Sequence, residues 1–214
     1  MAAGLLAVST ALIATLATAQ KAQSMDLTTP SFLVATRDLQ DPLFQHAVIL
    51  MIPSTESPLL AGVIINSPAK VRVRDMFPQA RQLKSTQETM YLGGPVEPDE
   101  ASVIFRASST PGSATRIFDD TYVATGHAAV AGILKDPRFT DLRVILGKAQ
   151  WLRDQLYSEV MRGAWYVVPA KPDLVFADPR DLWSTLVQGG DLQEAAARHG
   201  PALNLPQWHL DGTN

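Results

Sequence analysis

Residues that could bind a ligand gather where short apolar runs end. Gly93, Gly94 and Pro95 follow one such run, and glycines in a strand-terminal turn let backbone N–H groups approach a ligand and bind an anion. Asn66 ends another apolar run. The two segments could therefore form a polar mouth between strand ends, where ligands commonly bind. The simpler alternative is a tight turn that binds nothing.

His127 is a second candidate, because it follows Gly126 at the start of a small apolar stretch. It could act as a general base if Asp119 or Asp120 lay within reach. A histidine in this position is more often a capped or partly buried structural residue. The four histidines show no H-x-x-H, H-E-x-x-H or H-x-E spacing, so we predict no metal site.

Several enzyme signatures are absent or incomplete. The sequence has no G-x-S-x-G motif, and Ser67 and Lys70 match Ser-x-x-Lys without the Ser-Asp-Asn or Lys-Thr-Gly segments that accompany it in penicillin-recognising enzymes. It also has no G-x-G-x-x-G motif and no P-loop, and it contains no cysteine, which excludes a thiolate nucleophile. We therefore predict no cofactor and assign no catalytic residue.

Composition indicates one globular domain without a general affinity for polyanions. The 214 residues are 46% hydrophobic and 18% charged, enough for a sizeable core. The net charge of −3 argues against broad attraction to nucleic acid or an anionic membrane surface. Arg72, Arg74, Arg81 and Lys84 are diluted by acidic residues and are interpreted as a solvated face. We expect a protein or small-molecule partner and no direct nucleic-acid binding.

The N-terminal segment resembles an export leader. Residues 2–19 carry no charged side chain, and Ala17 and Ala19 give an A-x-A cleavage pattern. Cleavage after Ala19 would place the protein in the periplasm or outside the cell, with no stable membrane span in the mature chain. No Lys or Arg precedes the apolar run, so two alternatives stay open: an uncleaved anchor, and a cytoplasmic protein whose translation starts at Met25.

The elements that must position these residues follow from the hydrophobic pattern. Short apolar runs predict strands at 32–35, 47–52, 61–65, 102–105, 122–124, 142–146 and 164–168, with 47–65 forming a hairpin and Gly147 ending the strand before it. Helices are predicted at 73–77, 127–134, 181–187 and from Ala149 to Gly163, where Leu152, Leu156 and Val160 recur at helical spacing. Strands grouped with few helices favour an α+β domain with a curved, largely antiparallel sheet.

The domain is expected to span residues 26–190, after a leader at 1–19 and before a C-terminal extension at 191–214. Within that extension, residues 192–198 could form one or two helical turns. Trp151, Trp165 and Trp183 lie among apolar residues, and we expect each to pack in the core with its indole N–H bonded to a carbonyl.

Four segments together resemble the YqgE/AlgH family, and they occur in that family's order. They are the D-P-x-F turn in residues 31–44, the G-x-x-x-N strand in 61–66, the G-G-P-V turn in 91–96 and the series of W, Q-L and G-x-W in 146–165. The resemblance covers roughly residues 30–187. It implies a bifurcated, barrel-like sheet with flanking helices. It implies little chemistry, because the family lacks an agreed activity and its link to transcription of exopolysaccharide genes comes without a recognised DNA-binding motif.

Our leading hypothesis is a non-enzymatic binding or regulatory domain whose ligand lies at the Gly93-Gly94-Pro95 turn. The first alternative is a hydrolase or other enzyme that uses polar groups near Asn66 and His127. The second is a cytoplasmic protein linked to transcriptional regulation that starts at Met25.

Overall fold

The computed structural model describes residues 30–53, 59–80, 83–112, 114–139 and 141–189. The predicted leader, the C-terminal extension and Arg81 lie outside these residues. The strands are β1 (Ser31–Ala35), β2 (Val48–Ile52), β3 (Leu59–Ile64), β4 (Pro68–Arg72), β5 (Thr89–Leu92), β6 (Val96–Arg106), β7 (Thr115–Phe118), β8 (Thr121–Thr125), β9 (Leu142–Leu152) and β10 (Trp165–Pro169). The helices are α2 (Val73–Met76), η1 (Ser85–Gln87, a 3₁₀ turn), α3 (His127–Lys135), α4 (Arg153–Met161), α5 (Pro172–Val175) and α6 (Pro179–Gln188).

One curled sheet organises the molecule, and it forks at β9. Its main order is β10-β1-β2-β3-β9-β6-β8-β7, with antiparallel neighbours throughout. The second half of β9 pairs with β3, whereas its first half pairs in parallel with β5, which in turn pairs with β4. The predicted α+β fold with a bifurcated sheet is confirmed, as is the predicted hairpin of β2 and β3.

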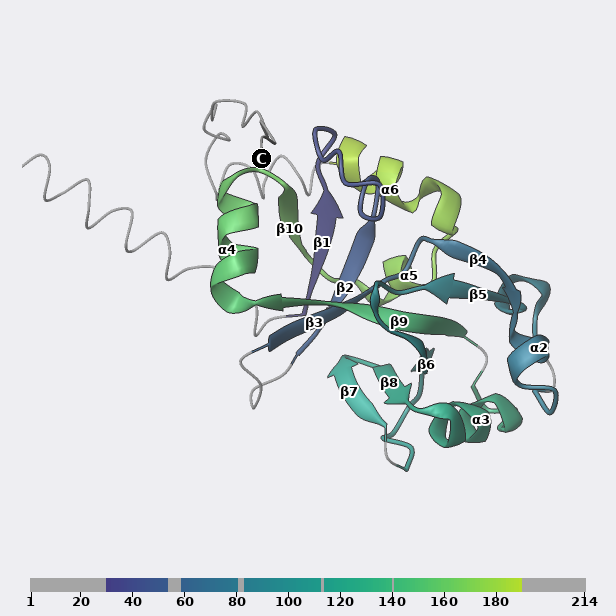
Figure 1. Cartoon of the computed structure of the whole chain (residues 1–214). Coiled ribbons are helices and arrows are strands. Elements are labelled where there is room, and N and C mark those ends of the chain that lie inside the picture. The colour runs from purple at the N-terminus through teal and green to yellow at the C-terminus, as the bar shows by residue number, and fades with distance from the viewer. Residues whose placement is uncertain (1–29, 54–58, 81–82, 113, 140, 190–214) are drawn as a thin grey trace, which may run out of the picture.

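Helices cover both faces of the sheet at different places. Alternation along β1 places Phe32 and Val34 against Leu182 of α6, and Leu33 on the opposite face against Leu156 of α4. At the other end of the molecule α3 packs on β6 and β8 (Figure 1). Strands β1 and β2 are therefore buried on both faces, which explains their continuous apolar sequences.

Three predicted boundaries are wrong: the strand predicted at 102–105 begins at Val96, and the two boundaries around β9 also differ. β9 does not end at Gly147, which has φ of 70° and lets the strand bend and continue to Leu152. The predicted helix from Ala149 begins only at Arg153, because residues 149–152 hydrogen-bond with β3 and this tertiary pairing overrides the helical spacing. Leu152 is 58% exposed and takes no part in the apolar face of α4.

Strands β4 and β7 and helix α5 were not predicted, because they are short and their sequences are mixed in polarity. Along the described ranges, no helix is long and apolar enough to cross a membrane.

Candidate functional site

The Gly93-Gly94-Pro95 turn carries the chain from one edge of β9 to the other. Before the turn, β5 lies on one edge, with Leu92 opposite Leu146. After it, β6 begins on the opposite edge, with Val96 opposite Lys148. Three residues must therefore pass directly over the backbone of β9.

This crossing explains why both glycines are present. A Cβ on Gly93 would lie less than 3.0 Å from the carbonyl oxygen of Gly147, and one on Gly94 would lie less than 3.0 Å from the backbone of Lys148. The Gly93 N–H donates to the Leu146 carbonyl at 2.7 Å, and the Gly93 carbonyl accepts from Ile64 N–H at 2.9 Å. The described contacts thus give the turn a packing role, and ligand binding by it stays a prediction.

Asn66 lies just after β3, and its side chain hydrogen-bonds to the start of β2. Its Oδ1 accepts from the Val48 N–H at 2.8 Å, and its Nδ2 donates to the His46 carbonyl at 2.9 Å. Both bonds tie the chain just after β3 to the segment that enters β2, so the described contacts of Asn66 are structural ones.

His127 is the first residue of α3, as predicted, and is exposed. Its ring stacks on Phe77 at 4.6 Å between centroids. Of the two acids considered as partners, Asp120 lies 3.8 Å from Arg106, and Asp119 accepts a hydrogen bond from Arg116 through its backbone carbonyl. The Asn66 and His127 contacts described here have no residue in common.

The Ser-x-x-Lys spacing has no helical basis. Lys70 lies in β4, which begins immediately after Ser67, so the two side chains are not one helical turn apart. The basic face is also made of exposed ion pairs: Arg72 with Asp75 at 3.1 Å and Arg74 with Glu88 at 3.6 Å.

Trp151 and Trp165 are buried as expected, Trp183 is only partly buried, and Trp183 alone donates to a carbonyl. Trp183 Nε1 donates to the Ala35 carbonyl at 2.8 Å. Trp151 and Trp165 instead donate to the same carboxylate oxygen of Glu159, at 3.1 and 2.9 Å. Their rings meet edge to face with centroids 6.2 Å apart.

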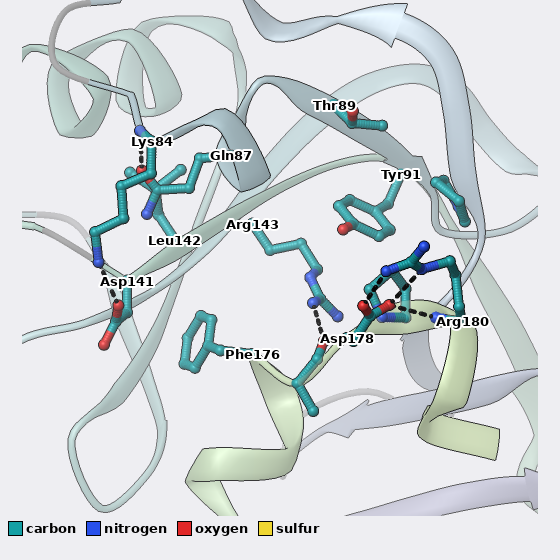
Figure 2. A pocket seen from close by; sticks show the side chains of 13 residues that line it. Lys84, Gln87, Thr89, Tyr91, Asp141, Leu142, Arg143, Phe176, Asp178 and Arg180 are labelled. Carbon is teal, nitrogen blue, oxygen red and sulfur yellow. Dashed lines mark hydrogen bonds and ion pairs between the residues drawn. The ribbon is translucent and has the colours of Figure 1, made fainter. Parts of the chain in front are cut away.

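The strongest candidate for a ligand site is a cavity of about 510 Å³, here called the Arg143 cavity. Its walls come from η1 and β5 on one side, from the start of β9 beneath, and from the turn between α5 and α6 on the other. Figure 2 shows the Arg143 side chain reaching between Tyr91, Phe176 and Asp178. Segments far apart in sequence therefore converge on one charged group.

Arg143 is the unusual residue of this cavity, because it is a cation with only 6% of its surface exposed. Its Nη1 donates to the Ile65 carbonyl, and its Nη2 donates to the Ala177 carbonyl at 2.8 Å. The guanidinium carbon lies 4.5 Å from the centre of the Tyr91 ring, a cation–π distance. Burial lowers the pKa of Arg143, and the nearby Tyr91 and Asp178 partly oppose this shift.

The two carboxylates of the cavity each have another cation close by. Asp141 lies 3.2 Å from Lys84 Nζ, and Asp178 lies 2.6 Å from Arg180 Nη2 (Figure 2). The Arg180 side chain, by its hydrogen bonds, lowers the pKa of Asp178 to about 2. Asp178 is therefore ionised at neutral pH, and each of the two carboxylates forms its ion pair with a cation other than Arg143.

This site was not predicted from the sequence. Its one signal was a charged residue, Arg143, inside the apolar run 142–146. An arginine in a buried strand requires a partner or a cavity. The lining residues lie in segments up to about a hundred residues apart, and only the fold brings them together. Among the described residues, no cluster of His, Asp and Glu could hold a metal ion.

Comparison with known proteins supports the family resemblance. The family model described as AlgH-like matches residues 32–193. A UPF0301 protein from Thermobifida fusca is 34% identical over 197 residues, covering 82% of this chain and 95% of the relative. A UPF0301 protein from Shewanella frigidimarina is 27% identical over 187 residues, covering 83% of this chain and all of the relative.

Solved structures share the fold. A crystal structure of a Corynebacterium diphtheriae protein aligns with a TM-score of 0.64 and 26% identity, over 78% of this chain and 91% of that chain. The solution structure of AlgH from Pseudomonas aeruginosa aligns with a TM-score of 0.60 and 24% identity, over 84% and 93%. The chain therefore belongs to the AlgH-like family of UPF0301 proteins, and its forked, curled sheet is the fold that these structures share.

Proposed function

We propose that this protein is a non-enzymatic binding or regulatory domain whose small-molecule ligand occupies the Arg143 cavity. The main support is the buried guanidinium of Arg143, which lines a volume of about 510 Å³. Ligand sites usually have about 300–1,000 Å³ and a few polar groups placed in apolar walls. The net charge of −3 supports a small molecule rather than a nucleic acid as the partner.

A regulatory role is supported by what Arg143 holds together. Its Nη2 bond to the Ala177 carbonyl ties the turn between α5 and α6 to β9. Helix α6 is in turn fixed to β1 by the bond from Trp183 to Ala35. A ligand bound by the remaining N–H groups of the guanidinium would change the strength of the Ala177 bond and with it the position of α6 on the surface of the molecule.

The test is an amide NMR titration of the full chain with small anionic, neutral and cationic compounds. The signals of Thr89, Tyr91 and Ala177 should move with saturation for at least one class. Movement confined to Gly94 would instead favour the Gly93-Gly94-Pro95 turn. If no class moves the cavity signals, the proposed site is wrong. An activity that is lost in folded His127→Ala would contradict the non-enzymatic role.

A further inference from the structure

The charged side chains of the Arg143 cavity do not balance. Three cations, Lys84, Arg143 and Arg180, face two carboxylates, Asp141 and Asp178. Each carboxylate is within 3.2 Å of Lys84 or Arg180, whereas Arg143 has no carboxylate at ion-pair distance in the described ranges. The cavity therefore has one surplus positive charge, and it resides on the most deeply buried cation.

The guanidinium of Arg143 keeps donors for an additional acceptor. It has five N–H groups in a planar fork, and its described hydrogen bonds go to the carbonyls of Ile65 and Ala177. The N–H bonds lie in the plane of the guanidinium, so a further acceptor must approach in that plane, whereas the Tyr91 ring lies 4.5 Å from the guanidinium carbon. A planar carboxylate is the group that such a fork binds best.

Burial makes an anionic partner favourable. A cation removed from water without a counter-ion is costly, and two carbonyl dipoles compensate it only in part. The other walls include Phe176, whose half-buried side chain offers apolar contact to the body of a ligand. The cavity thus combines one charge-specific position with an apolar surface.

We infer that the ligand is a small organic carboxylate with an aromatic or apolar body, whose carboxylate binds Arg143 and whose body contacts Phe176. This inference rests on the proposed binding function of the cavity. One negative charge neutralises the surplus. A phosphate monoester, with nearly two negative charges, would leave an excess beside Asp141 and Asp178.

The experiment compares three probes that share a phenyl ring, phenylacetate, phenylacetamide and phenyl phosphate, on the unmodified protein. Dissociation constants come from the amide signals of Thr89 and Ala177. Phenylacetate should bind at least about tenfold more tightly than either of the others. Equal or tighter binding of phenylacetamide or phenyl phosphate overturns the carboxylate assignment while the cavity remains a binding site. If none of the three binds but a cationic compound does, the carboxylate assignment is wrong and the cavity is still a binding site. If no class of compound binds, both the carboxylate assignment and the proposed binding function are wrong.

Variants test the assigned residue. Arg143→Lys keeps the charge but loses the fork, and it should weaken phenylacetate binding by at least about tenfold. Arg143→Gln should abolish the preference for phenylacetate over phenylacetamide, and its thermal unfolding is recorded first to verify that it folds. Arg153→Gln, which removes an exposed arginine at the start of α4, is the matched control and should bind phenylacetate normally. Unchanged binding in Arg143→Lys would contradict the assigned contact.

Discussion

At the scale of single residues, the Glu159 carboxylate accepts hydrogen bonds from three side chains, two of them tryptophans. One carboxylate oxygen accepts from both Trp151 and Trp165, and the other accepts from Gln155 at 3.0 Å. Hydrogen bonds to a charged acceptor contribute about 1.5–3 kcal/mol. The helix α4 is thereby fixed to strands β9 and β10 through one side chain.

Glu159→Gln should lower the free energy of unfolding by about 1–3 kcal/mol, because an amide offers one accepting oxygen and no charge. The tryptophan fluorescence of the folded protein should change with it. Asp99→Asn makes the same chemical change at an exposed residue and should alter stability by less than about 0.5 kcal/mol. Equal urea midpoints for the two variants would contradict a structural role for Glu159.

The burial of the tryptophans was predictable from sequence, but their partners were not. Apolar neighbours are enough to predict that Trp151 and Trp165 are buried. Their shared partner, Glu159, lies eight and six residues away on α4. It could be predicted only from the correct start of that helix, and the helical spacing placed the start four residues too early. Arg143 was missed for a related reason: its acceptors, Ile65 and Ala177, lie 78 and 34 residues away.

At the scale of elements, the crossing over β9 makes Gly93 far more sensitive to substitution than a helical glycine. Gly93→Ala should destabilise the protein by about 3 kcal/mol or more, because its Cβ would overlap the Gly147 carbonyl and backbone atoms must shift. Gly132→Ala in α3 should stabilise it by about 0.5–1 kcal/mol, since nothing lies within 4 Å and alanine favours the helix. Urea unfolding of both variants measures the contrast, and a tolerated Gly93→Ala would refute the close crossing.

The N-terminus of α6 should respond to acid. Asp178 is its N-cap and accepts from the Arg180 N–H at 3.0 Å, and Arg180 lowers the carboxyl pKa from its ordinary 3.8 to about 2. Because the folded-state pKa is the lower one, the stabilisation is present above pH 3.8 and is lost as the pH falls toward 2. The protection of the amides at the start of α6, measured relative to their intrinsic exchange rates, should therefore fall over that interval.

Carboxyl NMR titration of Arg180→Gln checks the cause of this shift. The Asp178 midpoint should rise from about 2 toward 3.8, because the guanidinium hydrogen bond is removed. Asp136, whose pKa is also lowered to about 2, by Arg138, is an internal control and should keep its midpoint in the same variant. An unchanged Asp178 midpoint would show that Arg180 is not responsible.

Most strands were predictable because their apolar runs record burial on one or both faces. The fork of the sheet could not be predicted from those runs, and the bifurcated sheet was expected only from the family resemblance. The Gly93-Gly94-Pro95 motif was recognised as a tight turn with a possible ligand, but the backbone crossing that requires both glycines involves a strand more than fifty residues later and could not be predicted.

At the scale of the whole molecule, export remains a prediction, since residues 1–19 lie outside the described ranges. Mass spectrometry of the protein purified from its native host should give a chain that begins at Gln20, because the A-x-A pattern ends at Ala19. A chain that begins at Met25 would support the cytoplasmic alternative, and an intact N-terminus in the membrane fraction would support an anchor. The result determines which small carboxylates the protein can meet.

The fork at β9 also makes the two halves of the polypeptide mutually dependent. If the chain is cut in the connection between β6 and β7, strands β8, β9 and β10 are separated from their neighbours β6, β3 and β1. Each fragment then lacks most of its hydrogen-bond partners. Neither should fold alone, whereas an equimolar mixture should reassemble and melt in a single cooperative transition, so the protein is suited to fragment complementation.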